Sequence, residues 1–212
     1  MRLEDLHPPK ADFFYRGAVE VAQALLGTYL ISEIGGVTTG GRIVETEAYT
    51  DDDPASHSFS GPRERNSSMF QTGGTLYVYL IYGVHYCLNV VTGPAGVGEA
   101  VLLRAIEPEW GVKEMARRRG KAGTTQKVSR RPGQGLADGP GKLAQALGVT
   151  IDEDRSSLLD GPVRLLLPRE PMPEERIIAT HRIGISKAAR MHRRFVDSES
   201  KLLSKRVYKG RK

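Results

Sequence analysis

The sequence predicts a single-domain, mixed α/β (α+β) fold: a curved antiparallel sheet with surrounding helices and a protruding aromatic β-hairpin. Helical and strand-like segments follow one another irregularly, and neither an internal repeat nor a long linker separates two cores. The chain has 212 residues, and that length is about 1.4 times a typical domain. Its composition, 39% hydrophobic and 26% charged, permits a large core and excludes a disordered polyelectrolyte.

The first quarter of the chain predicts one helix and two strands. Residues 17–26 carry apolar side chains at helical spacing, and Gly27 is suited to end that helix. Residues 29–34 predict a strand, the following glycine pair a turn, and residues 42–49 a second strand. Residues 51–65 are polar and rich in turn formers, which favours a loop.

The middle of the chain predicts the hairpin and one more strand. Residues 75–91 are dense in aromatic and β-branched side chains, and Gly83 interrupts them, so the bend is expected near Tyr82 and Gly83. Residues 99–106 predict a strand that stops at Glu107 and Pro108.

The rest of the chain is predicted to contain fewer regular elements. Residues 113–135 lack apolar periodicity and predict a surface loop, whereas residues 142–147 predict a short helix. Residues 163–167 and 182–185 predict late strands. We expect one domain over residues 1–212, with a basic tail from about residue 200 that is either flexible or bound to a partner.

Basic residues gather in three segments. Residues 113–131, 182–194 and 201–212 carry +7, +5 and +6, which is +18 together; since the whole chain carries +6, the remainder carries −12. Such segregation suggests a polyanionic partner, either nucleic acid or an anionic membrane surface. Solvated loops and a basic tail that keeps the protein soluble explain any one segment equally well. No segment approaches the roughly 18 apolar residues of a membrane span, and the N-terminus lacks the apolar run of a signal peptide.

Cysteine usage indicates the compartment. Cys87 is the single cysteine, so neither an internal disulfide nor a multi-cysteine zinc site can form. We expect a cytoplasmic protein, nucleoid-associated if the source is prokaryotic, with Cys87 as a small packing residue.

Two carboxylates are predicted to share one face of the strand at residues 42–49. Alternation places Ile43, Glu45, Glu47 and Tyr49 together, opposite residues such as Ala48. The pair suits acid/base work on a glycosidic bond or metal binding, and it is also compatible with the exposed side of an edge strand. Arg104 lies in another apolar strand, where an unpaired guanidinium is costly, so a Glu–Arg partnership would satisfy both.

Two further features suggest contact with nucleic acid. A tyrosine at a hairpin bend, Tyr82, is badly placed for its own core and could wedge between stacked bases. The turn from Gly139 to Lys142 opens a helix, whose free N–H groups could hold a phosphate; an ordinary capped helix explains it equally well.

Taken together, the motifs resemble the alkyladenine DNA glycosylase family, also called mammalian-type 3-methyladenine DNA glycosylases. The matching stretches occur in family order and are RIVETEAY at 42–49, ASHS at 55–58, RNSSMF at 65–70, GTLYVYLIYGVHYCLNV at 74–90, VLLRAIEP at 101–108, GPGKL at 139–143 and RIGI at 182–185. The resemblance implies a monomeric, monofunctional N-glycosyl hydrolase without cofactor or metal. It would flip alkylated or deaminated purines (3-methyladenine, 7-methylguanine, hypoxanthine, ethenoadenine) out of duplex DNA and leave an abasic site.

The resemblance also implies roles for individual residues. Glu47 corresponds to the general base that activates water, and Arg104 and the backbone carbonyl of Ile183 to groups that hold this water. Tyr49, His57, Tyr79 and Asn89 correspond to the pocket around the flipped base. Tyr82 corresponds to the intercalating residue, and Gly141, Lys142 and Arg182 to elements near the DNA backbone.

Two other classes of function remain open at this stage. A non-catalytic RNA- or DNA-binding module could use the same basic loops and tyrosines. A carboxylate hydrolase of small glycosides would explain the paired acids but leaves the basic segments without a role.

Overall fold

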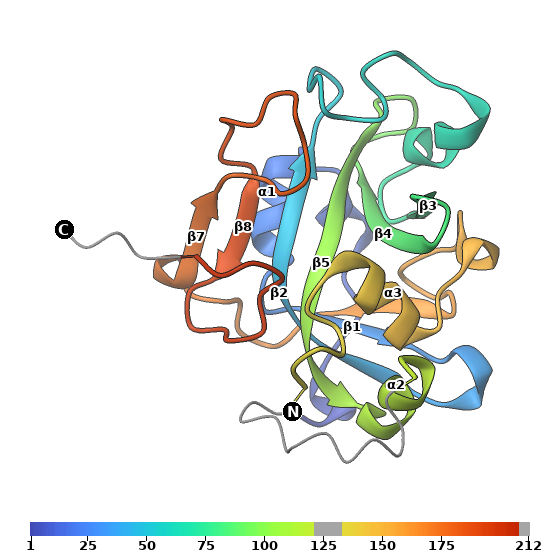
Figure 1. The fold of residues 1–212 in the computed structure, drawn as a ribbon, viewed down its shortest axis with the longest axis vertical. Coiled ribbons are helices and arrows are strands. Elements are labelled where there is room, and N and C mark those ends of the chain that lie inside the picture. Colours follow the sequence, from blue (N-terminus) through green and yellow to red (C-terminus); the bar gives the residue numbers. More distant parts are fainter. Residues whose placement is uncertain (121–132, 208–212) are drawn as a thin grey trace.

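A mixed α/β fold built on one antiparallel sheet is confirmed by the computed structural model, which describes residues 1–120 and 133–207. The sheet has eight strands; six follow the order β3-β4-β5-β2-β1-β6, and β8 joins β2 and carries β7 at its outer edge (Figure 1). Their bounds are β1 Tyr29–Ser32, β2 Thr39–Tyr49, β3 Leu76–Ile81, β4 His85–Thr92, β5 Glu99–Trp110, β6 Val163–Leu166, β7 Ile177–Thr180 and β8 Arg194–Asp197.

Strand β2 lies in the interior of the sheet, and its two acids, Glu45 and Glu47, are fully buried. One edge pairs with β5 along nearly its whole length, while the other pairs first with β1 and then with β8. Register shifts flank Glu45, and Ile43 belongs to the main apolar cluster together with Ala48. The strict alternation predicted for Ile43 is therefore broken, and the edge-strand interpretation of the acids is wrong.

Strand β5 is longer than predicted. It continues through Pro108 to Trp110, with Pro108 opposite Gly41 at a register shift. A proline lacks an N–H for the ladder and is tolerated at such irregularities. A Cβ at Gly41 would clash with the carbonyl oxygen of Glu107, so the close approach of the strands requires glycine there.

The aromatic segment forms the β3–β4 hairpin with its bend where the sequence predicts it. The Val84 N–H bonds to the Ile81 carbonyl at 3.2 Å, and the two residues between them, Tyr82 and Gly83, have φ of 53° and 69°. Positive φ at both central positions is characteristic of a type I′ turn, which matches the twist of a two-stranded hairpin. The side chain of Tyr82 is 83% exposed.

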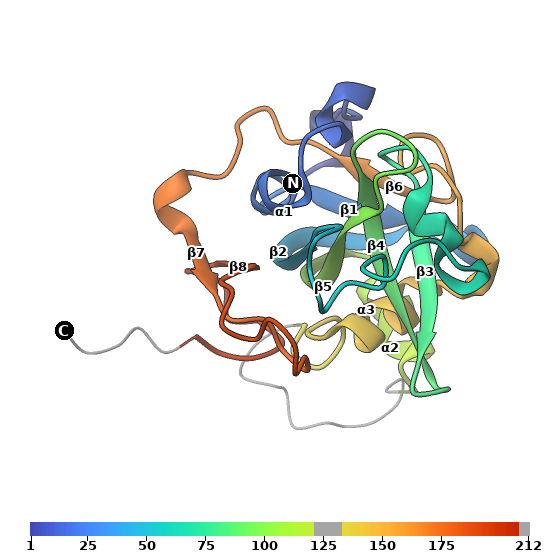
Figure 2. The same ribbon diagram turned by 90° about the horizontal axis from the view of Figure 1, so that it is seen from above.

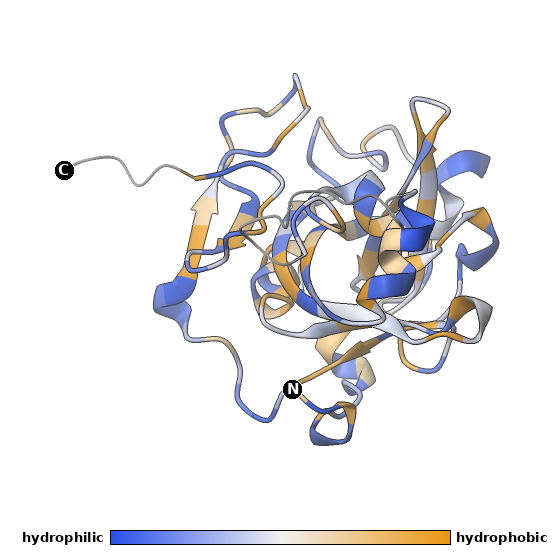
Figure 3. Ribbon diagram, turned by 60° about the horizontal axis from the view of Figure 1, so that its bottom comes forward, coloured by the Kyte–Doolittle hydropathy of each residue, from blue (hydrophilic) through white to orange (hydrophobic). Residues whose placement is uncertain are grey.

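Helices cover both faces of the sheet. α1 (Ala18–Ala24) packs behind β2 and β5, while α3 (Pro140–Leu147) lies in front, against β4 and β5 (Figures 1 and 2). α3 buries Leu143 and Leu147, and Figure 3 shows hydrophobic and hydrophilic residues interleaved along the helices and strands. Both helices match the predicted segments closely. Short 3₁₀ turns occupy Leu3–Asp5, Ala11–Phe14, Ile34–Gly36, Glu64–Phe70, Ile151–Glu153 and Glu174–Arg176.

Part of the predicted basic loop is helical instead. α2 (Val112–Arg118) buries only Met115, and Glu114 forms ion pairs with Arg117 and Arg118 one turn away. A helix anchored by one apolar residue leaves no periodic pattern in the sequence, which is why the loop prediction is wrong here. Residues 121–132 of the same prediction lie outside the described residues.

The C-terminal third differs most from expectation. Residues 182–185 are not a strand, whereas β7 and β8, which the sequence did not reveal, flank this segment. The first part of the basic tail, residues 200–207, is described: Leu202 is buried there and Ser204 forms hydrogen bonds to Glu45. Residues 208–212 lie outside the described residues. Within the described residues, no helix is long and apolar enough to cross a membrane.

Candidate active site

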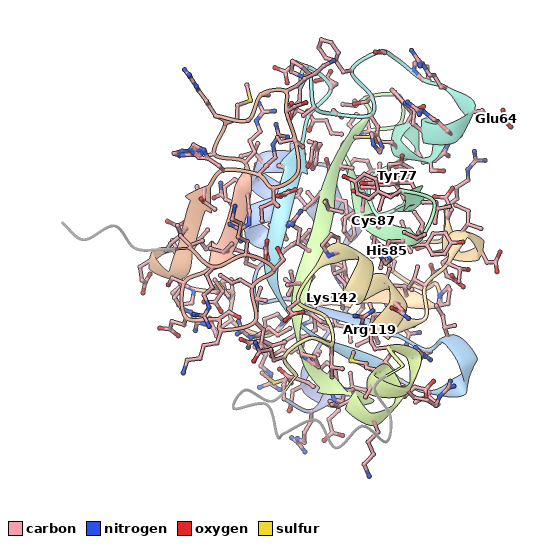
Figure 4. The ribbon with its side chains drawn as sticks, in the orientation of Figure 1. Glu64, Tyr77, His85, Cys87, Arg119 and Lys142 are labelled. Atoms are coloured by element: carbon pink, nitrogen blue, oxygen red, sulfur yellow. The ribbon has the colours of Figure 1, made fainter. Side chains whose placement is uncertain are left out.

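A cavity of about 320 Å³ opens between the hairpin, the C-terminal end of β2 and the segment after β7. All four residues expected to enclose a base (Tyr49, His57, Tyr79 and Asn89) line this cavity, and Tyr82, Arg104 and Ile183 line it as well. Figure 4 shows Tyr77 and Cys87, two further lining residues, on the hairpin beside it. The structure thus brings together residues that are up to 134 positions apart, as Tyr49 and Ile183 are.

One wall of the cavity is aromatic. The His57 ring lies 4.6 Å from the Tyr79 ring, centroid to centroid, in an edge arrangement, and its Nδ1 is 2.9 Å from the Tyr77 hydroxyl. Burial, and then the charge of Arg65, lowers the pKa of His57, so the imidazole is neutral near pH 7. Asn89 is buried beneath this wall and donates from Nδ2 to the Tyr77 carbonyl at 3.1 Å.

Tyr49 also lines the cavity, and a buried arginine supports it. The Arg182 guanidinium lies 4.6 Å from the Tyr49 ring centroid, donates to the Ala48 carbonyl at 3.0 Å and forms an ion pair with Asp53. Both side chains of that ion pair are fully buried. Arg182, expected near the DNA backbone, therefore lies behind the pocket wall and holds the tyrosine ring in place.

Glu47 lies directly behind the cavity wall and is completely buried. Its Oε1 accepts from the Ile183 N–H at 2.8 Å, and its Oε2 accepts from the Tyr49 hydroxyl at 3.0 Å and from Arg104 Nη1 at 3.1 Å. Burial raises the pKa of Glu47; Arg104 and the two neutral donors oppose this but do not outweigh it. All three partners of this carboxylate line the cavity.

Glu45, two residues earlier, has a different environment. It accepts from Arg104 Nε at 2.9 Å, from Arg194 Nε at 2.7 Å, and from the backbone N–H and the hydroxyl of Ser204, each at 2.6 Å. Burial raises its pKa, but the two guanidinium groups and Ser204 outweigh burial and hold it below the ordinary value. The expected Glu–Arg partnership is present, and one arginine serves both acids.

Sequence reasoning missed three residues of this cluster: Asp53, Arg194 and Ser204. Arg194 counted toward a basic segment, and Asp53 lay in the polar segment 51–65 that was predicted only as a loop. Their pairing shows that the +5 of residues 182–194 is partly internal, since Arg182, Arg193 and Arg194 all bond to buried acids. Ser204 had no signal in the sequence.

The rim of the cavity carries the remaining predicted residues. Pro140 lines the cavity at the start of α3, and a Cβ on Gly141 would come within 3.0 Å of His85, so this glycine allows α3 to pack against the hairpin. Lys142 forms an ion pair with Asp138 at 2.8 Å, and its side chain remains 45% exposed. In the described residues, no cluster of three or more His, Cys, Asp or Glu side chains could hold a metal ion.

An aromatic cavity thus lies beside two buried acids whose pKa values shift in opposite directions. Comparison with known proteins identifies the class as a DNA glycosylase, a hydrolase of base excision repair. The chain belongs to the methylpurine-DNA glycosylase (MPG) family, whose model matches residues 12–201.

Similar proteins match along nearly their whole length. A protein of Methanoculleus marisnigri with the name "Putative 3-methyladenine DNA glycosylase" is 48% identical over 198 residues, which cover 92% of this chain and 98% of that protein. Proteins with the same name from Rhizobium etli and Nitrosospira multiformis are 47% and 44% identical; the matches cover 91% and 93% of this chain, and 87% and 93% of theirs.

Proposed function

We propose that this enzyme flips alkylated or deaminated purines out of duplex DNA into the aromatic cavity and hydrolyses the N-glycosidic bond with a water activated by Glu47. The observation that carries the proposal is the position of Glu47: its three hydrogen-bond partners all line the cavity, and burial raises its pKa toward the range of an effective general base.

The reaction needs little further machinery when the base is already cationic. N3- or N7-alkylation gives the purine a positive charge, so the bond between sugar and base breaks without protonation of the base. Glu47 takes a proton from the water that attacks C1′, and Arg104 with the backbone carbonyl of Ile183 positions that water. Arg104 Nη1 and the Ile183 N–H hold the carboxylate of Glu47 itself. The products are the free base and an abasic site, and the strand stays intact.

Selectivity comes from the cavity walls. Tyr49 and the His57–Tyr79 pair line the cavity with aromatic surfaces on which a flat base can stack. Asn89 at the buried edge disfavours the exocyclic amine of guanine. Since His57 is neutral, it supplies hydrogen bonding rather than a proton, and neutral lesions such as hypoxanthine depart more slowly than cationic ones.

Duplex DNA is held at the rim of the cavity. Tyr82 extends from the hairpin turn in a left-handed backbone conformation, which costs a residue other than glycine roughly 1–2 kcal/mol, and it fills the gap left by the flipped nucleotide. Lys142 and the exposed basic residues contact phosphates. We infer a monomer that acts on DNA in the cytoplasm or nucleoid.

The experiment is base release from defined duplexes. Oligonucleotides that contain 7-methylguanine, hypoxanthine or ethenoadenine, and methylated bulk DNA, are incubated with the protein, and released bases and alkali-labile abasic sites are quantified. We expect release from the cationic lesions first and no strand cleavage before alkali treatment. The proposal is overturned if no lesion yields free base.

A further inference from the structure

The chain after β8 returns to the catalytic cluster, three residues beyond the last residue matched by the family model. There the Ser204 N–H and hydroxyl both donate to Glu45, at 2.6 Å each, and Arg194 Nη2 donates to the carbonyl of Lys205 at 2.5 Å. Leu202 is buried just before these contacts. The segment is therefore attached to the sheet on both sides of Ser204.

Ser204 also contacts the arginine that links the two acids. Its hydroxyl oxygen accepts from Arg104 Nη2 at 3.1 Å and lies 3.4 Å from Nε, while Nη1 of the same guanidinium donates to Glu47. Three groups thus fix the planar guanidinium: Glu45, Glu47 and Ser204. Since a guanidinium has a rigid geometry, fixing Nε and Nη2 determines where Nη1 points.

We propose that Ser204 is a positioning residue for the reaction: it holds Arg104 in the orientation that places Nη1 against Glu47, so that the C-terminal segment completes the active site. This inference rests on the proposed function of Glu47. Ser204 does not line the cavity, and it acts through Arg104.

Loss of the Ser204 hydroxyl has a defined electrostatic consequence. Arg104 is the one guanidinium that bonds to Glu47 among the described residues, and it lowers the pKa of Glu47 against burial. Without the Ser204 hydroxyl the guanidinium can turn toward Glu45, and it then offsets less of the rise in the pKa of Glu47 that burial causes. The pKa of Glu47 therefore rises further, and its carboxylate is protonated at higher pH. The other titratable or charged groups around Glu47 are Glu45 and Tyr49 on β2, Cys87 on β4 and Arg194 on β8.

The test compares two serines of the same segment. Ser200 also donates its hydroxyl to a glutamate, Glu107, at 2.7 Å, but Glu107 does not line the cavity. Ser204→Ala and Ser200→Ala are measured in the full chain for single-turnover base release between pH 4.5 and 8, for the Kd of lesion DNA and for Tm. Ser204→Thr, which keeps the hydroxyl, is the second variant.

For Ser204→Ala we expect the single-turnover rate at pH 7 to fall about tenfold, as for loss of a hydrogen bond to a charged group, with the acid limb of the rate profile at higher pH and the Kd unchanged. Ser200→Ala and Ser204→Thr should keep the wild-type acid limb. The inference is overturned if Ser204→Ala keeps that limb, or if Ser204→Thr or Ser200→Ala shifts it as much.

The outcome separates this inference from the proposed function. If the wild type releases base and Glu47→Gln does not, while Ser204→Ala behaves like Ser200→Ala, only the role of Ser204 is lost. If the wild type releases no base, the function fails and the role of Ser204 fails with it.

Discussion

Glu45 and Glu47 lie two residues apart on one strand, are equally buried and share Arg104, yet their pKa values shift in opposite directions. Glu45 faces two guanidinium groups and a serine, whereas Glu47 faces one guanidinium and two neutral donors. Burial disfavours both anions, and the number of cations in contact decides which effect prevails. The comparison assigns Glu45 to structure and leaves Glu47 available for proton transfer.

The largest expected effect is on activity, and it comes from substitution of Glu47 rather than Glu45. Glu47→Gln keeps the shape of the side chain but cannot take a proton, so we expect base release to fall by about 10²–10⁴-fold, with lesion-DNA binding largely retained. The measurement is single-turnover base release together with a binding titration. Retained turnover would move the general base to another residue and remove the contrast between the acids.

Substitution of the other acid, Glu45, should mainly lower the free energy of unfolding. Glu45→Gln leaves Arg104 and Arg194 without their shared carboxylate, and breaking a buried ion pair in this way costs about 3–5 kcal/mol. Urea unfolding at pH 7 measures the loss, with Glu47→Gln as the matched variant on the same strand. An equal or smaller loss for Glu45→Gln than for Glu47→Gln would contradict the structural role.

Lowering the pH should reduce the contribution of Glu45 to the stability of the folded protein. Because its folded-state pKa is below the ordinary value of 4.5, its stabilisation is fully present above about pH 4.5 and is lost as the pH falls through the folded-state pKa. We therefore expect the stability difference between the wild type and Glu45→Gln to shrink below pH 4.5. Unfolding series from pH 7 to pH 3 test this; a difference that grows toward low pH has the wrong sign.

The rate of base release should depend on the protonation of Glu47, whose pKa is shifted in the opposite direction to that of Glu45. The pKa of Glu47 is raised, and only its deprotonated form accepts a proton from water, so the wild-type rate should fall as pH decreases while the pH is still above 4.5. Single-turnover rates across this range, on a cationic lesion, provide the check. A rate independent of pH down to 4.5 would show that Glu47 is not the titrating base.

The smallest effect concerns Tyr49. Tyr49→Phe removes the hydroxyl that donates to Glu47 but keeps the ring, so we expect a loss of rate of about tenfold or less and an unchanged Kd. Single-turnover kinetics and a binding titration distinguish this from loss of the pocket wall. An increase in Kd comparable to the decrease in rate would show that the hydroxyl acts on the base instead.

Local patterns predicted the elements that local sequence specifies. Apolar spacing predicted α1 and α3, and the aromatic run interrupted by Gly83 predicted the hairpin and its turn. The same reasoning failed where stability comes from distant contacts. It stopped β5 at Pro108, which a register shift against Gly41 accommodates, and it missed β7 and β8, whose pairing no local pattern reveals.

The sequence alone determined the chemical inventory of this protein: two acids on one strand, an arginine in another, a tyrosine at a hairpin bend, and the motifs of a DNA glycosylase family. Only the tertiary structure decided how the acids differ. The groups that set their pKa values are distant in the sequence: Arg104 and the Ile183 N–H are 57 and 136 residues from Glu47, and Arg194 is 149 residues from Glu45. A carboxylate responds to burial and to nearby charge, and chain folding determines both.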